Sequence, residues 1–64
     1  MTLDTGLKDY SARLAFKISR DEITGKLNSD RARKMLKQID DIMLRLAKGS
    51  ITEREAKRQI HAVY

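Results

Sequence analysis

The side chains that could do chemistry in this sequence are few, and most of them stand alone. His61 is the single histidine, and there is no cysteine. Asp40 and Asp41 are adjacent, but neighbouring residues of a helix point about 100° apart and cannot converge on one cation without further ligands. No nucleophile stands with a base, and no glycine-rich loop could cradle a phosphate. The sequence therefore predicts a protein that is not an enzyme and binds neither a metal nor a cofactor.

Basic residues are the other group of side chains that could take part in binding. The chain has 14 Lys and Arg against 9 Asp and Glu, and the excess lies wholly after residue 25. Several bases stand at the start of a predicted helix, where the helix dipole disfavours positive charge, and contact with nucleic-acid phosphates is one explanation. A solvated face with Asp41 paired to Lys37 or Arg45 is the other. The candidate nucleic-acid contacts are Arg31, Arg33, Lys34 and Lys37.

The length limits what the chain can do alone. A chain of 64 residues buries only about 60% of its unfolded surface, and it has no disulfide or metal to support it. A protein partner, either a second copy or a different protein, is the expected support. No stretch approaches the ~20 apolar residues that span a bilayer, and the acidic start does not resemble a signal peptide. We expect a cytoplasmic protein without membrane contact.

Apolar residues recur at spacings of three and four along most of the chain, which is typical of amphipathic helices. There is no proline, and Gly25 and Gly49 each follow a periodic run, as expected of glycines just beyond a helix. Asn28 or Ser29 can cap the second helix. Thr52 can cap the third in a box with a later glutamate, each side chain bonding the other residue's amide. The prediction is one all-α domain over residues 1–64, with helices at about 7–24, 30–48 and 53–63.

The first predicted helix has apolar residues on two sides. Leu7, Tyr10, Leu14 and Ile18 form one stripe, and a second stripe lies more than a quarter turn away. A three-helix protein can cover one such stripe itself. Covering both requires either wrapping by the other two helices or a partner, and the sequence leaves these alternatives open. The second stripe contains Ala12, Phe16 and Ile23, with Ser19 between them.

Three segments of the chain carry a family resemblance. They are residues 11–15 (Ser-Ala-Arg-Leu-Ala), residues 25–30 (Gly-Lys-Leu-Asn-Ser-Asp) and residues 49–56 (Gly-Ser-Ile-Thr-Glu-Arg-Glu-Ala), followed by a final Tyr64. In this layout the chain resembles the VbhA-like antitoxins, which are short three-helix partners of Fic-domain adenylylating toxins. The resemblance covers most of residues 11–64, and the last segment is the best match.

The resemblance implies a function and a binding surface. In the family, the first helix docks beside the toxin's nucleotide site, and the glutamate of a Ser/Thr-x-x-x-Glu-Gly motif prevents productive placement of the ATP γ-phosphate. Here Gly25 matches the final position, whereas Thr24 replaces the glutamate and Arg20 replaces the serine. The expected function is a non-catalytic regulator that binds and inhibits a larger toxin. The expected partner-binding residues are Ala12, Phe16, Ser19, Arg20, Glu22, Ile23, Thr24 and Gly25.

Two other functions remain open from the sequence. The basic residues of the second helix suit a small DNA- or RNA-binding regulator, with binding that weakens as salt rises. Small basic helical proteins also suit the inhibition of another bacterial or phage-related enzyme complex, although no residue here points to such a target.

Overall fold

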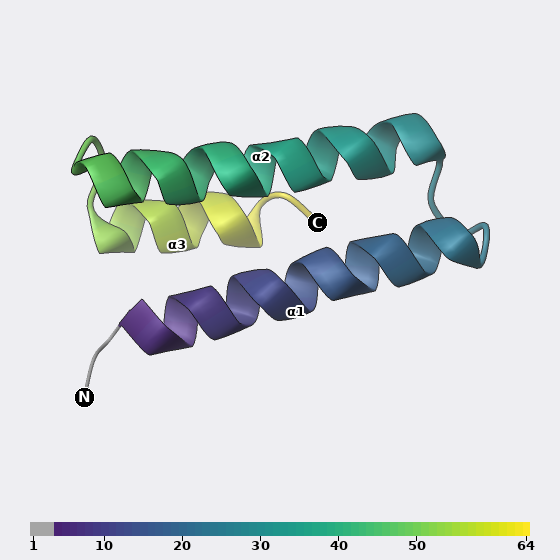
Figure 1. Cartoon of the computed structure of the whole chain (residues 1–64), viewed down its shortest axis with the longest axis horizontal. Helices are drawn as coiled ribbons and strands as arrows, with labels where there is room; N and C mark the ends of the chain where they lie inside the picture. The colour runs from purple at the N-terminus through teal and green to yellow at the C-terminus, as the bar shows by residue number, and fades with distance from the viewer. Residues whose placement is uncertain (1–3) are drawn as a thin grey trace.

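The computed structural model describes residues 4–64, and within this range it contains three α-helices and no strand. α1 spans Asp4–Ile23, α2 spans Ser29–Lys48 and α3 spans Glu53–His61. α1 and α2 run antiparallel to each other, and α3 turns back along α2 (Figure 1). The predicted all-α fold of three helices is confirmed. α1 begins at residue 4 rather than 7, and α3 ends at residue 61 rather than 63.

The helix ends use the capping chemistry that the sequence predicts. The Asn28 side chain accepts a hydrogen bond from the amide of Asp30 at 2.7 Å, and the Thr52 hydroxyl accepts from the amide of Glu55 at 3.1 Å. The expected return bond from Glu55 is replaced, because its carboxylate accepts from Arg58 at 2.9 and 3.0 Å and from Gln59 at 2.9 Å. These two side chains lower the pKa of Glu55, the Gln59 bond most strongly.

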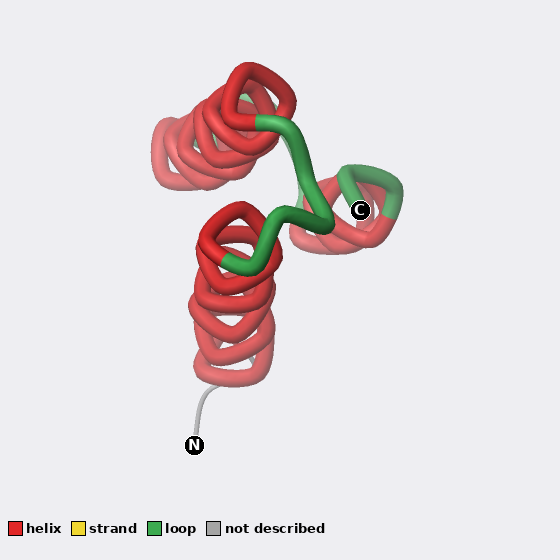
Figure 2. The backbone as a smooth tube through the Cα atoms, turned by 90° about the vertical axis from the view of Figure 1, so that its right-hand side faces the viewer, coloured by secondary structure: helices red, strands yellow, loops and turns green. Residues whose placement is uncertain are grey.

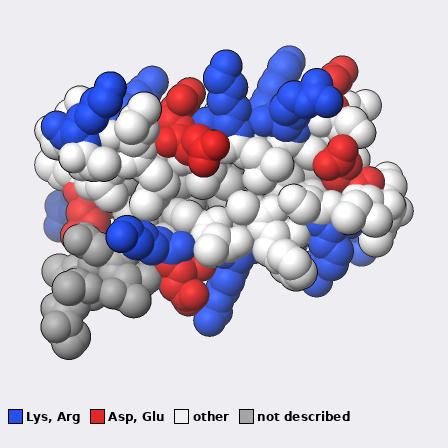
Figure 3. Space-filling view, viewed as in Figure 1, with Lys and Arg blue, Asp and Glu red and all other residues white. Residues whose placement is uncertain are grey.

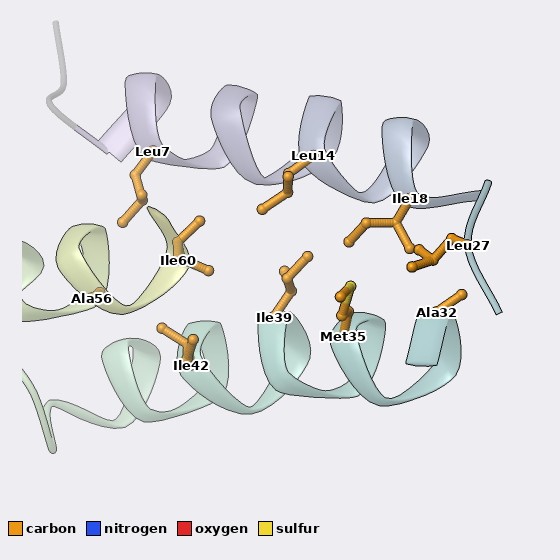
Figure 4. Packing of buried hydrophobic residues seen from close by; sticks show 10 residues of the cluster. All are labelled: Leu7, Leu14, Ile18, Leu27, Ala32, Met35, Ile39, Ile42, Ala56 and Ile60. Atoms are coloured by element: carbon orange, nitrogen blue, oxygen red, sulfur yellow. The ribbon is translucent and has the colours of Figure 1, made fainter. Parts of the chain in front are cut away.

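The core is built from one stripe of each helix (Figure 4). Ile18 of α1 and Ile60 of α3 are fully buried, and the first predicted stripe of α1 supplies Leu7 and Leu14 to the same cluster. Because α3 adds only two buried side chains, most of the core lies between α1 and α2. The buried apolar residues are Leu7, Leu14, Ile18, Leu27, Ala32, Met35, Ile39, Ile42, Ala56 and Ile60.

α3 covers only one side of the α1 and α2 pair (Figure 2). The ring of Tyr10 stacks on that of His61, with centroids 4.3 Å apart and planes 13° apart, and this contact holds the end of α3 against α1. Beyond α3, the hydroxyl of Tyr64 donates to the carboxylate of Asp21 near the end of α1. Both contacts lie on the same side of α1, so the opposite side of the helix pair has no third helix over it.

Candidate partner-binding surface

The second apolar stripe of α1 lies on the uncovered side and is exposed. Phe16 is 72% exposed and Ile23 is 84% exposed, the two highest values among the large apolar residues described. Ala12 is exposed and Ser19 is half-buried. The alternative in which α2 and α3 wrap this stripe is therefore wrong for Phe16 and Ile23. We call these four residues, Ala12, Phe16, Ser19 and Ile23, the outer face of α1.

The remaining predicted contact residues lie at the C-terminal end of α1 and just beyond it. Arg20, Thr24 and Gly25 are exposed, and Glu22 is half-buried. Figure 3 shows the side of the molecule that α3 does not cover. A band of uncharged side chains runs between α1 and α2, and Lys, Arg, Asp and Glu gather along its outer edges. This face of the molecule thus presents uncharged side chains bordered by charges of both signs.

The backbone that follows Ile23 is fixed by hydrogen bonds to one carbonyl. The carbonyl oxygen of Asp21 accepts from the amides of Lys26 at 2.8 Å and Leu27 at 3.1 Å, and from the Thr24 hydroxyl at 3.3 Å. Gly25 adopts a left-handed conformation with φ of +85°, which a side chain at that position would disfavour. These bonds close what we call the α1 turn, residues 21–27. The turn sets the direction of Thr24 and Gly25 relative to the outer face of α1.

The side chain of Asp21 joins the α1 turn to the last residue of the chain. Asp21 is 7% exposed, and its carboxylate accepts from the Tyr64 hydroxyl while lying 4.0 Å from the guanidinium of Arg20. The Asp21 bond is the largest of the effects that raise the pKa of Tyr64 above its ordinary range. The ammonium of Lys17 lies 5.5 Å from the centre of the Tyr64 ring. This side-chain bond links the α1 turn to the segment that follows α3.

Sequence reasoning missed two polar residues of α1 that are buried. Ser11 is 6% exposed and its hydroxyl lies 3.6 Å from the sulfur of Met43 on α2, while Asp21 pairs with Tyr64. Both positions fall on the core stripe, since Leu7, Ser11, Leu14, Ile18 and Asp21 follow one another at spacings of four and three. That spacing indicates burial, but Ser and Asp are usually exposed, so the two positions were not assigned to the core stripe.

The four basic residues proposed for nucleic-acid contact are all exposed, but they do not share one surface. Arg31 and Lys34 line a hollow between α2 and the end of α3, of about 310 Å³, together with Gln38. Arg33 and Lys37 are not among its lining residues, and Arg33, two positions after Arg31, lies on the opposite side of the helix from Arg31. The hollow therefore includes only two of the four predicted basic residues.

Two further findings concern residues 4–64. No three side chains of His, Cys, Asp or Glu gather there closely enough to hold a metal ion. None of the three helices is both long enough and apolar enough to cross a bilayer.

Comparison with protein-family models, with curated proteins and with solved structures finds no match to this chain.

Proposed function

We propose that this chain is a non-catalytic regulator that binds a larger protein through the outer face of α1 and the α1 turn. The observation that carries the proposal is the exposure of Phe16 and Ile23, 72% and 84% respectively, on a helix whose other stripe already fills the core. Burying a large apolar side chain is worth about 1.5–3 kcal/mol. Two such residues on one face therefore offer a partner a substantial part of a binding free energy.

The spacing of the outer face suits a helical partner. Ala12, Phe16, Ser19 and Ile23 follow one another at intervals of four, three and four residues, the repeat by which one helix packs along another. The small Ala12 and Ser19 alternate with the large Phe16 and Ile23, so a partner side chain can seat between the two large ones. We infer that the partner presents a helix with the complementary alternation of large and small residues.

Among possible partners, the resemblance to VbhA-like antitoxins favours a Fic-type adenylyltransferase toxin, bound in the cytoplasm. Thr24 occupies the position of the inhibitory glutamate and carries no charge. Glu22 lies two residues earlier and is half-buried. Restraint of the toxin by this chain would therefore come from α1 covering the nucleotide site rather than from a carboxylate that displaces the γ-phosphate.

The proposal is tested by co-expression with a Fic-domain protein encoded by the neighbouring reading frame. The wild-type chain should co-purify with that protein and reduce its transfer of AMP from ATP. Phe16→Asp and Ile23→Asp should each abolish co-purification, because either change places a charge within the buried contact. Circular dichroism should show that both variants remain helical when free, since neither residue is packed in the folded chain.

Leu44→Asp is the matched control. Leu44 is 53% exposed but lies on α2, outside the proposed surface. The same apolar-to-acidic change there should leave co-purification intact. If the two α1 variants bind as well as the wild type, or if the Leu44 variant alone loses binding, the outer face of α1 is not the contact surface.

A further inference from the structure

A groove lies between α2 and α3, and Figure 2 shows that α3 is on the far side of the helix pair from the face drawn in Figure 3. It consists of two adjoining hollows of about 390 and 310 Å³ that share Gln38, Ala62 and Val63. The apolar side chains of Ile42 and Val63 line the larger hollow, and Gln38 and Gln59 enter it from the two opposing helices. We call this the α2/α3 groove.

The charges of the α2/α3 groove are mostly positive. Arg31 and Lys34 lie at one end and Arg45 at the other, with Asp41 as the acidic residue that lines it. None of the three bases forms an ion pair with another described side chain, since the pairs within 4.0 Å there join Arg13 to Asp9, Arg20 to Asp21 and Arg58 to Glu55. The pairings of Asp41 expected from the sequence are therefore not formed with Lys37 or Arg45.

The order of residues along this side of α2 resembles the requirements of a helix laid in a DNA groove. Residues 31 and 45 are about 21 Å apart along the helix axis, at 1.5 Å per residue. Cations at the two ends can reach the phosphates on either side of a major groove about 12 Å wide. Gln38 and Asp41 lie between those cations, and amide and carboxylate groups are side chains that bond the edges of adenine and cytosine.

We propose that the α2/α3 groove binds duplex DNA, with Arg31, Lys34 and Arg45 on the phosphates and Gln38 and Asp41 toward the bases. This activity goes beyond the protein contact assigned to α1 and uses a different face. DNA is favoured over duplex RNA because the deep, narrow major groove of A-form RNA does not admit a helix. The protein could then hold DNA and a protein partner at once.

The test is fluorescence anisotropy of the full chain with a labelled 20-base-pair DNA duplex, measured from 50 to 200 mM salt. Three phosphate contacts give a slope of about −2.7 in log K against log salt, which is a loss of about 40-fold over that range. A duplex RNA of the same sequence should bind more weakly at every salt concentration. No DNA binding at 50 mM salt, or equal binding of the RNA, would overturn the proposal.

A matched pair of double variants locates the contact on α2. Lys34→Glu with Arg45→Glu should abolish most of the binding and flatten the salt dependence. Arg33→Glu with Lys37→Glu changes the same number of charges on the same helix, at residues that do not line the groove, and should cost less. Equal losses of DNA affinity in the two double variants would mean that only net charge matters, and would show that the groove is not the DNA-binding site. Phe16→Asp should bind DNA normally, which separates this proposal from the protein contact of α1.

Discussion

Ile18 and Ile23 are two isoleucines of one helix with opposite surroundings, and replacing each by alanine separates folding from binding. Ile18 is 0% exposed and Ile23 is 84% exposed. Removing a buried isoleucine side chain costs about 2–5 kcal/mol, because the lost burial is joined by the cost of the cavity. A domain of 64 residues has about 3–10 kcal/mol in total. Ile18→Ala should therefore remove a large part of the stability of the folded chain.

Ile23→Ala should change the free energy of unfolding by no more than about 0.5 kcal/mol, as is usual for exposed positions. Urea unfolding followed by circular dichroism at 222 nm measures both variants. With an m-value of about 1 kcal/mol/M, the urea concentration at the unfolding midpoint should be lower by 2 M or more in the Ile18 variant than in the wild type, or that variant should fail to fold. Equal destabilisation by the two variants would refute the assignment of Ile23 to a free surface, because it would mean that Ile23 packs within the folded chain.

Three further predictions follow from the α1 turn and its neighbours. Gly25→Ala should lower the free energy of unfolding, measured in urea, by about 1–2 kcal/mol, because φ is +85° although the space around the residue is open. Gly6→Ala within α1 should raise it by about 0.5–1 kcal/mol. An unchanged free energy for the Gly25 variant would contradict the left-handed turn. Because the pKa of Tyr64 is raised above 10.0, the contribution of its bond to Asp21 is complete below pH 10 and is lost as pH rises through the folded-state pKa. The thermal midpoint of the wild type should therefore exceed that of Tyr64→Phe below pH 10 and converge with it at higher pH, and a constant difference would argue against the bond. Arg20→Ser with Thr24→Glu restores the family motif and should strengthen inhibition of AMP transfer by a Fic-type partner; unchanged inhibition would count against that partner or that docking mode.

The core stripes were largely predictable from the sequence. Leu7, Leu14 and Ile18 repeat at helical spacing, and burial follows from that repeat whatever the partner helix is. The ends of α2 and α3 were predictable for a similar reason, because Asn28 and Thr52 bond amides only two or three residues away. Each of these features depends on neighbours in the sequence, which a single chain contains in full.

The exposure of Phe16 and the pairing of Asp21 could not be predicted in the same way. Whether Phe16 is covered depends on which side of α1 receives α3, and both sides carry apolar residues. The bond from Tyr64 to Asp21 joins residues 43 positions apart, so it exists only once all three helices are placed. Which basic residues of α2 line a hollow likewise required the position of α3.

The bond between Asp21 and Tyr64 links the proposed binding surface to the segment that follows α3, which gives a route for thermodynamic coupling between them. If the α1 turn has its bound geometry only while α3 is docked, a partner that recognises Ile23 and Gly25 also favours the docked state. By reciprocity, whatever loosens α3 must weaken that partner by the same factor, even when it touches no contact residue. The nine residues of α3 then act as an effector segment for a surface that they do not form.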